Sequence, residues 1–396
     1  MSDDGRWMRL AIDRAIGARG RVEPNPCVGC AIVKDGKLVG VGRHEKYGGP
    51  HAEPNALKVA GEESRGATAF VTLEPCCHSG GEKQTPPCAP RLIEAGVSRV
   101  VIGCLDPNPR VSGGGVKQLQ EAGVDVEVGV LGEACRQLIA PFYARQILGR
   151  PYVTLKWAVS ADGRVAGREG RPVRITNDRS DRVVQQLRGR CDAIAVGTNT
   201  LANDDPRLTA REANPPRSPV RALFSNSLKF PGDRQLWQDG PQAIVYTHDA
   251  HDSFGEHVIA GLPKHVVVVR LPAHDNGRGG RRFKMADAFA DLFERGVTHL
   301  LIEPGPKLAG DLIAGRLCDR VWVFRGQRDI GDDGLLAPEL PADWSPVATL
   351  DLAGDALAEY LPANDAWFGD FPSPDLALAS VGALSAAVGA AGTWIS

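Results

Sequence analysis

The pattern that most limits how this chain can fold is a set of metal-binding residue types split between two stretches. Pro50-His51-Ala52-Glu53 carries an imidazole and a carboxylate, and Pro75-Cys76 is followed by Cys88 twelve positions after Cys76. One imidazole and two thiolates bind zinc tetrahedrally and leave a fourth position open for water, which distinguishes a catalytic zinc site from a closed structural one. The fold must therefore bring His51, Cys76 and Cys88 to one place as metal ligands.

Glu53 is the predicted catalytic residue, because a carboxylate beside a zinc-bound water can take its proton and pass it to a leaving group. Side chains two positions apart on a helix point roughly 200° apart. His51 and Glu53 can therefore share a site only at a helix end, and Pro50 marks such an end. Pro75 is expected to begin a helix at Cys76 in the same way, after a strand at residues 69–73. The positive end of a helix dipole favours thiolates and carboxylates.

A structural or differently ligated zinc site is the alternative on residue types alone. The chain has nine cysteines, and some of these can be small buried apolar side chains. Four further residues could act as ligands: Cys27, Cys30, Cys77 and His78. A closed site would have no use for Glu53, and Cys77 is disfavoured because the side chains of neighbouring residues diverge.

Length and charge restrict the classes of protein. A chain of 396 residues predicts two or three domains of about 150 residues each. Its 46 basic and 48 acidic residues nearly balance, which argues against a nucleic-acid or anionic-membrane partner. No apolar run approaches the ~18 residues of a membrane span, and the acidic start does not resemble a secretory signal. We expect a cytoplasmic homo-oligomer with reduced cysteines and a small-molecule substrate.

The first part of the chain alternates predicted strands and helices, which indicates a three-layer α/β/α domain. An amphipathic helix is expected at residues 3–18. A hairpin is expected around Asp35-Gly36, a favoured two-residue turn. Further strands are predicted at 99–103 and 124–128, and further helices at 89–95, 116–122 and 132–145.

The His-x-Glu and Pro-Cys pattern resembles the zinc-dependent cytidine and nucleobase deaminases. Those enzymes place the second cysteine three positions on, where this chain has Ser79. The stretch from Glu74 to His78, followed by Thr85-Pro86-Pro87-Cys88, instead resembles the deaminase half of the bifunctional RibD family of riboflavin biosynthesis. The gap before the second cysteine is about three residues longer here, around residues 81–83. The resemblance implies a cytidine-deaminase-like fold.

Four side chains are predicted substrate contacts because they match that family. Asn25 lies in a Pro-Asn-Pro loop, His44 follows the hairpin, and Asp106 and Asn108 lie in Asp-Pro-Asn-Pro after a strand. Ligands of open α/β sheets bind in such loops. Without the resemblance, Asn25 is better explained as a turn residue, and the Asp-Pro-Asn-Pro turn needs no function. A lone histidine such as His44 is more often solvated or satisfied within the protein.

The second part of the chain resembles the family's reductase domain, which implies a dihydrofolate-reductase-like α/β fold. A domain boundary is expected near Gly149, giving a deaminase domain at residues 1–148, a reductase domain at 149–366 and a tail of unknown role at 367–396. Strands are predicted at 152–159, 193–196, 221–225, 243–246, 265–269 and 299–303, with helices at 178–190, 285–295 and 307–314.

The resemblance also implies the residues of the reductase site. Arg188 and Arg211 are expected to bind a substrate phosphate bidentately, and Lys156 to orient the ribose beside Asp162 and Glu303. Gly305-Pro306 would present helix N-terminal amides to a phosphate. The predicted substrate contacts are Lys156, Arg188, Leu208, Arg211 and Glu303. The predicted cofactor contacts are Ala158, Arg174, Thr200, Asp204, Asn226, Gly305, Pro306, Lys307, Leu308, Ala309, Gly310 and Asp311.

Several residues depart from the family pattern near the expected cofactor. Pro172 and Arg174 replace a customary serine and tryptophan, and Ser225-Asn226 stands where Asp-Ser is usual. Arg174 would either pair with a cofactor phosphate or point to solvent. The match fades beyond Phe324, because residues 325–336 lack the expected apolar strand and loop.

The leading hypothesis is a bifunctional enzyme with zinc and NADPH as cofactors. It would hydrolytically deaminate 2,5-diamino-6-(5-phosphoribosylamino)pyrimidin-4-one and then reduce the ribosyl chain to ribityl. One alternative is an active deaminase whose degenerate reductase half serves as a binding or scaffold module. A second, a nucleic-acid base deaminase, would need a basic channel with stacking aromatic residues, which the near-neutral charge does not favour.

Overall fold

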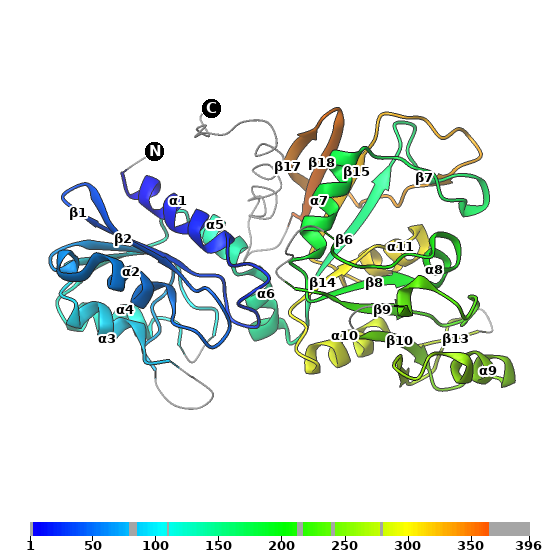
Figure 1. Cartoon of the computed structure of the whole chain (residues 1–396), viewed down its shortest axis with the longest axis horizontal. Coiled ribbons are helices and arrows are strands. Elements are labelled where there is room, and N and C mark those ends of the chain that lie inside the picture. Colours follow the sequence, from blue (N-terminus) through cyan, green and yellow to red (C-terminus); the bar gives the residue numbers. More distant parts are fainter. Residues whose placement is uncertain are drawn as a thin grey trace. The chain divides into compact units, whose positions relative to one another are not determined.

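The computed structural model describes residues 3–78, 85–108, 111–211, 217–238, 242–277 and 280–363. The chain divides into two compact units (Figure 1). One consists of the residues up to Tyr152 together with Ala286–Leu300, and the other of Val153–Met285 and Leu301–Pro362. The predicted tail at 367–396 and Pro109 of the Asp-Pro-Asn-Pro loop lie outside the described residues.

The first unit is built on a five-stranded sheet in the order β2-β1-β3-β4-β5. Its strands are β1 (Gly29–Lys34), β2 (Lys37–Arg43), β3 (Thr68–Leu73), β4 (Arg99–Cys104) and β5 (Asp125–Val128). Strand β1 is antiparallel to β2 and β3, whereas β3, β4 and β5 run parallel. The predicted hairpin turn is confirmed: Asp35 and Gly36 have φ values of 49° and 71°, the left-handed conformation that such a turn requires.

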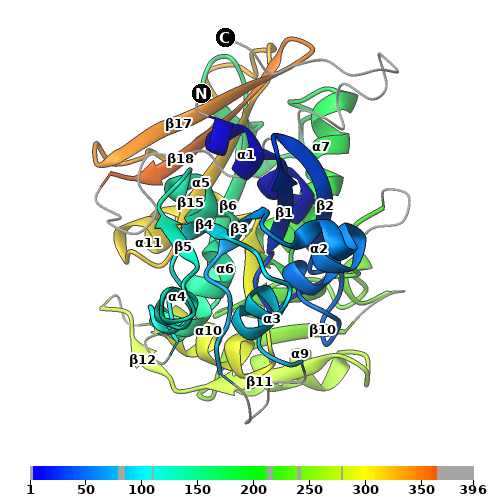
Figure 2. The ribbon, with the colours of Figure 1, turned by 90° about the vertical axis from the view of Figure 1, so that its left-hand side faces the viewer.

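Helices cover both faces of this sheet, so the predicted three-layer α/β/α architecture is confirmed. Figures 1 and 2 show α1 (Asp3–Ile16) and α5 (Gly132–Leu138) on one side, with α2 (Ala52–Ala60), α3 (Cys88–Glu94) and α4 (Gly114–Glu121) on the other. Helix α2 lies directly on the backbone of β2, because a Cβ atom at Gly42 would be 2.4 Å from the carbonyl oxygen of Ala52. This close approach places the N-terminus of α2 at the end of β2.

Two predictions about helices in this unit were wrong. Pro75 does not begin a helix, because residues 74–78 form a loop in which the Cys76 carbonyl accepts bonds from the amides of Cys88 and Ala89 at the start of α3. The helix predicted at 132–145 is interrupted: α5 ends at Leu138, and α6 (Ala140–Tyr143) and a π-helical turn (Ala144–Leu148) follow. Pro141 lacks an amide hydrogen, and an Arg19 nitrogen lies 2.9 Å from the Leu138 carbonyl.

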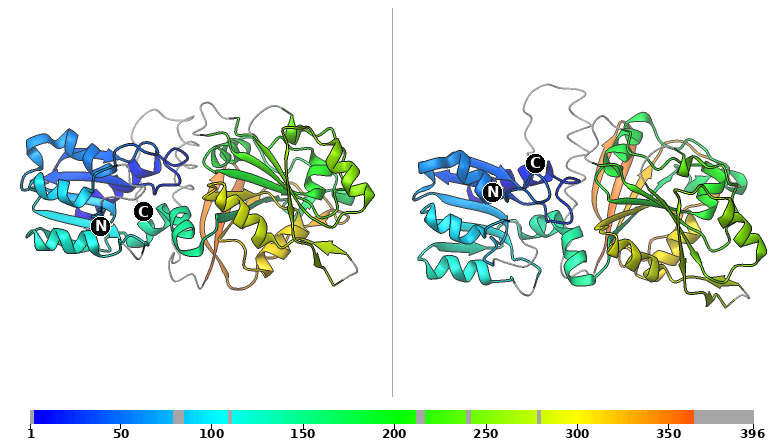
Figure 3. Two further views of the ribbon diagram at one scale, coloured as in Figure 1. Left: turned by 90° about the horizontal axis from the view of Figure 1, so that it is seen from below. Right: turned by 60° about the horizontal axis from the view of Figure 1, so that its bottom comes forward.

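The second unit, coloured green to orange in Figure 3, is built on a sheet of nine strands. The strands lie in the order β11-β10-β9-β8-β14-β6-β15-β18-β17. They are β6 (Tyr152–Val159), β8 (Ala193–Gly197), β9 (Val220–Phe224), β10 (Ala243–His248), β11 (Val267–Leu271), β14 (His299–Ile302), β15 (Arg320–Arg325), β17 (Trp344–Leu352) and β18 (Asp355–Pro362). The helices are α7 (Asp178–Arg188), α8 (Thr198–Asp204), α9 (Ser253–Gly261), α10 (Met285–Glu294) and α11 (Pro306–Ala314). Two small ribbons pair β7 (Arg164–Ala166) with β16 (Leu335–Leu336) and β12 (His274–Asp275) with β13 (Arg281–Arg282).

Alternate residues of the second sheet face one large apolar core. Ile194 and Val196 of β8 and Leu301 of β14 contribute to it, and Val183 and Leu187 of α7 cover it. This alternation is what a sheet with helices on its faces requires. Because the strands pack into this core, the residues at their carboxyl ends are held in fixed positions.

The hairpin formed by β17 and β18 was not predicted. Its turn contains Ala353 and Gly354 with φ values of 60° and 97°. The charged Glu359 faces inward, which interrupts the apolar pattern by which a strand is recognised in a sequence. Its carboxylate pairs with Arg320 at 2.9 Å, and both side chains are fully buried. Within the described residues, no helix is long and apolar enough to cross a membrane.

Candidate active sites

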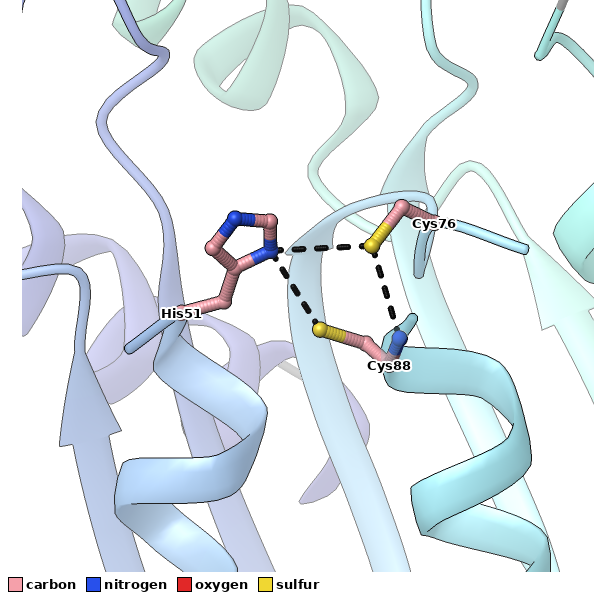
Figure 4. Close-up of side chains that lie close together, drawn as sticks. All are labelled: His51, Cys76 and Cys88. Carbon is pink, nitrogen blue, oxygen red and sulfur yellow. Dashed lines mark hydrogen bonds between the residues drawn. The ribbon is translucent and has the colours of Figure 1, made fainter. Parts of the chain in front are cut away.

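His51, Cys76 and Cys88 converge at one end of the first sheet (Figure 4). His51 is the residue before α2, Cys76 lies in the loop after β3, and Cys88 is the first residue of α3. The Nδ1 atom of His51 lies 3.6 Å from Cys76 Sγ and 3.3 Å from Cys88 Sγ. The Cys88 amide donates to Cys76 Sγ at 3.4 Å. The structure thus brings together the three residues that the sequence predicted as ligands.

The donor set fits zinc. Bonds of about 2.0 Å to nitrogen and 2.3 Å to sulfur at a tetrahedral angle place the donors about 3.5 Å apart. The measured separations of 3.6 and 3.3 Å agree with that value. Among the described residues, this is the one cluster of three or more His, Cys, Asp or Glu ligand atoms, all within 4.8 Å of one another, and it includes none of Cys27, Cys30, Cys77 and His78.

Glu53 lies in the first turn of α2 beside this cluster, and only 3% of its surface is exposed. Burial, and then the nearby Cys76, raise the pKa of Glu53 to about 7. Its Oε2 atom has no hydrogen-bond partner among the described residues. A buried carboxylate oxygen without a partner is costly, and a water at the open position of a catalytic metal would satisfy it. Glu53 is therefore placed to exchange a proton there.

Thr85 is a site residue to which sequence reasoning gave no role. Its hydroxyl oxygen lies 3.1 Å from His51 Nε2. When Nδ1 of His51 binds a metal through its lone pair, Nε2 carries the hydrogen and donates it to Thr85. Such a contact fixes the tautomer and orientation of a metal-binding imidazole. In the sequence, the position of Thr85 in the Thr-Pro-Pro-Cys stretch was the only feature that pointed to this residue.

Asn25 and His44 lie together next to the metal cluster. His44 Nδ1 is 2.9 Å from the Pro50 carbonyl oxygen, and its Nε2 is 3.3 Å from Asn25 Nδ2. A carbonyl only accepts, so Nδ1 carries the hydrogen, and neutral Nε2 accepts from Asn25. Burial lowers the pKa of His44, although the bond to Pro50 opposes this. The His44 ring lies 5.4 Å from that of His51, so the Asn25–His44 pair adjoins the predicted metal ligands.

Asp106 and Asn108 lie in the loop after β4, as predicted. The Asn108 amide donates to Asp106 Oδ1 at 2.8 Å, which closes a turn. The Asp106 amide donates to a carboxylate oxygen of Glu74 at 3.1 Å. Glu74 was part of the sequence pattern but had no predicted role, and it is almost fully buried. The Oδ1 atom of Asp106 therefore stabilises the turn in this loop.

The second candidate site centres on Glu303, directly after β14. Arg188 at the end of α7 forms a two-pronged ion pair with it, at 2.7 Å from Nε and 2.8 Å from Nη2. Burial would raise the pKa of Glu303, but the charges of Arg188 and Lys156 outweigh burial and hold it at about 2. Burial lowers the pKa of Lys156, against the attraction of Glu303. Lys156 and Glu303 come together as predicted.

Two residues of the predicted arrangement have partners within the protein. The Nε and Nη2 atoms of Arg188 donate to Glu303. Asp162 accepts bonds from Ser160 and from the amides of Ile330 and Gly331. Residue types alone could not indicate these contacts, and the phosphate contact of Arg188 stays a prediction.

Arg211 is exposed, in contrast to Arg188. Its Nη1 lies 3.2 Å from the Thr209 hydroxyl. Burial of part of the side chain and the like charges of Arg188 and Arg207 lower its pKa. The carboxylates of Asp181 and Glu303 act in the opposite direction. Leu208 is fully buried in the core with a φ of 49°, so its side chain is not available to a ligand.

The predicted cofactor residues around α11 divide into two groups. Gly305 precedes α11, Pro306 is its first residue, and a Cβ atom at Gly305 would be 3.8 Å from the Thr200 hydroxyl. The amides of Lys307 and Leu308 lie in the first turn, where helices leave donors unused. Ala309 is fully buried, and Gly310 and Asp311 are exposed in the second turn, where amides bond within the helix. The helix start therefore remains the candidate phosphate site.

The other predicted cofactor residues are spread over several elements. Asp204 ends α8, and burial and Glu303 raise its pKa. Ala158 of β6 packs against the apolar core. The side chain of Asn226 accepts from the Phe283 amide at 3.0 Å. Ser225 is fully buried and accepts from the Leu228 amide at 3.0 Å, so it stabilises a turn.

Arg174 is 61% exposed and pairs with Asp178 and Asp181 at the start of α7. The bond to Asp181 measures 3.1 Å, and Nε donates to the Thr176 carbonyl at 3.2 Å. These contacts favour the alternative in which Arg174 faces solvent. The departure from the family pattern at this position therefore leaves no unpaired charge.

Replacing Arg188 by alanine should destabilise the second site. Arg188 and Glu303 are 11% and 15% exposed, and removing one partner of a buried pair costs about 3–5 kcal/mol. We expect the low end, because Lys156 still faces Glu303. Urea unfolding followed by circular dichroism measures this loss. Arg182→Ala, an exposed position on the same helix, is the control, and equal stability of the two variants would contradict the prediction.

Comparisons with known proteins agree with this geometry. The family model described as "Cytidine and deoxycytidylate deaminase zinc-binding region" matches residues 1–104, and "RibD C-terminal domain" matches residues 151–339. The second match does not favour the alternative of a half that only binds. The chain is 38% identical to the riboflavin biosynthesis protein RibD of Aquifex aeolicus over 83% of this chain and 88% of that protein. It is 37% identical to the protein of that name from Escherichia coli, over 83% and 89%.

Two solved structures are similar along nearly their whole length. RibD of Acinetobacter baumannii gives a TM-score of 0.76 at 30% identity, covering 91% of this chain and 99% of that one. The diaminohydroxyphosphoribosylaminopyrimidine deaminase/5-amino-6-(5-phosphoribosylamino)uracil reductase of Thermotoga maritima gives 0.76 at 32% identity, with the same coverage. The chain therefore belongs to the RibD family of bifunctional riboflavin biosynthesis enzymes, with a zinc-dependent deaminase followed by an NADPH-dependent reductase.

Proposed function

We propose that residues 1–148 hydrolyse the 2-amino group from 2,5-diamino-6-(5-phosphoribosylamino)pyrimidin-4-one and release ammonia. Residues 149–366 would then reduce the ribosyl chain of the product to ribityl. The observation that carries the proposal is the convergence of His51, Cys76 and Cys88 beside Glu53, whose Oε2 atom has no hydrogen-bond partner in the part of the chain that the structure describes. That arrangement provides three ligands and a separate proton carrier, as hydrolytic deamination requires.

In the deaminase, zinc held by His51, Cys76 and Cys88 supplies an acidified water when bound. Glu53 Oε2 takes a proton and returns it to the departing amino group, which leaves as ammonia. Burial supports both steps, because a carboxyl group with a pKa of about 7 can gain and lose a proton near neutral pH. Asn25, held by neutral His44, offers its amide oxygen to an N–H group of the pyrimidine.

In the reductase, NADPH supplies a hydride when bound. Lys156 in the interior of β6 and Glu303 directly after the neighbouring strand β14 would contact the ribose. Glu303 stays ionised because Arg188 and Lys156 stabilise its charge. We assign the substrate phosphate to Arg211, which is exposed and lies near the positive charge of Arg207. The start of α11 and Thr200 would hold a cofactor phosphate.

Incubating the purified chain with the diaminopyrimidine, with and without NADPH, tests both activities. Without NADPH we expect only the product in which oxygen replaces the amino group. With NADPH we expect that product to gain two hydrogens, as detected by mass spectrometry. Deamination without any reduced product at saturating NADPH would support the alternative in which the second half only binds.

The assembly and location of the chain are also part of the proposal. We propose a cytoplasmic homo-oligomer that acts on a small molecule and needs no nucleic-acid or membrane partner. Analytical ultracentrifugation measures the assembly, and a monomer at micromolar concentration would contradict it.

A further inference from the structure

Glu74 is a buried carboxylate with four backbone donors. One oxygen accepts from the amides of Gly115 at 2.8 Å and Val116 at 3.3 Å. The other accepts from the amides of Gly113 at 3.0 Å and Asp106 at 3.1 Å. Only 3% of the Glu74 surface is exposed. A carboxylate that is satisfied in this way holds its donors firmly, because losing it would leave several buried N–H groups without an acceptor.

These bonds connect three segments that are distant in the sequence. Glu74 follows β3 and stands two positions before Cys76, Asp106 follows β4, and Gly113 to Val116 form the start of α4. The start of α4 also presses on the Glu74 loop: a Cβ atom at Gly115 would be 2.0 Å from the Pro75 carbonyl oxygen. The negative charge further suits the positive end of the helix. Glu74 therefore anchors two loops. One is the loop at residues 74–78, which carries the predicted ligand Cys76 and is called the metal loop below. The other is the Asp106–Asn108 loop.

We propose that Glu74 is a positioning residue for deamination, which fixes the Asp106–Asn108 loop against the metal loop. The inference rests on the proposed function, in which that loop contacts the pyrimidine. Glu74 acts only through the backbone of Asp106 and α4, and the metal ligands keep a separate support. That support is the pair of bonds from the Cys88 and Ala89 amides to the Cys76 carbonyl, at 2.9 and 3.1 Å.

Glu74→Gln is the sharpest substitution, because it keeps the shape and removes the charge. Each oxygen of Glu74 serves two donors, so an NH2 group at either position would face two backbone N–H groups. No orientation of the amide avoids this conflict. Either the Asp106 and Gly113 amides or the Gly115 and Val116 amides lose their acceptor.

We expect Glu74→Gln to raise the KM of deamination by roughly 10- to 100-fold, the range seen when groups that orient a site are removed, with a smaller change in kcat. Zinc content and reductase activity in the same chain should stay at the original level. Glu121→Gln is the matched control, because Glu121 is 67% exposed at the far end of α4. A purely structural role would lower the unfolding temperature without moving KM, and that result would overturn the inference.

Asn108→Ala and the double variant separate this inference from the proposed function. Asn108→Ala alone should raise KM, and an unchanged KM would overturn the proposed role of the loop itself. If Glu74 acts through the loop, the double variant should raise KM no further than the larger single effect. Additive effects would overturn the inference while leaving the role of Asn108 intact. Should the glutamine variant not fold, Glu74→Asp decides in the same way: a raised KM supports the inference and an unchanged KM overturns it.

Discussion

Replacing Glu53 by glutamine is expected to slow deamination by roughly 10²–10⁴-fold, the contribution typical of a positioned acid–base group. Glutamine keeps the size of the side chain but cannot accept and return a proton. The zinc content should not change, because His51, Cys76 and Cys88 make up the ligand cluster without Glu53. Steady-state deamination rates and metal analysis of the same preparation measure the two quantities.

Glu63→Gln is a suitable control for this experiment. Glu63 is exposed in the short helical turn that follows α2, so its loss should change neither rate nor metal content. Reduction of the deaminated substrate reports on whether the rest of the chain is intact. Normal turnover by the Glu53 variant would mean that another group moves the proton.

Replacing Cys88 by serine should remove zinc and, with it, deamination. A serine hydroxyl is not ionised near neutral pH and is a poor zinc ligand, so two donors would remain where a catalytic site needs three. The expected zinc content falls from one ion per chain towards none. Reductase activity should persist, because every predicted reductase residue lies beyond residue 149. Atomic emission analysis of the dialysed protein measures the bound metal.

Cys77→Ser is the matched control for the zinc experiment. Cys77 is adjacent to the ligand Cys76, but its sulfur lies against α4, only 2.7 Å from where a Cβ atom at Gly114 would be. This variant should keep its zinc. Equal metal content in the Cys77 and Cys88 variants would contradict the ligand assignment.

The metal centre could be predicted from the sequence because zinc accepts few ligand types and its chemistry limits their number. His51, Glu53, Cys76 and Cys88 are all short-range features of recognisable stretches. Their supports were not predictable. Thr85 and Glu74 act through a histidine nitrogen and four backbone amides, and such partners are chosen by how loops meet in space.

The second site also shows that the partners of a side chain could not be predicted from the sequence. Arg188 and Arg211 looked equivalent in the sequence, because both are arginines that match the family. In the folded chain, Arg188 is buried against Glu303 while Arg211 is exposed. Burial decides which charge must be neutralised within the protein.

The alternation of strands and helices in the first part of the chain and the meeting of His51, Cys76 and Cys88 were predictable, because periodicity, turn chemistry and ligand type are local properties. The folded chain was needed to show that Cys76 lies in a loop, that Arg188 pairs with Glu303 and that an inward Glu359 completes a strand beside Arg320. Each of these depends on a partner more than ten residues away, since a buried charge or amide is stable only where the fold supplies its counterpart.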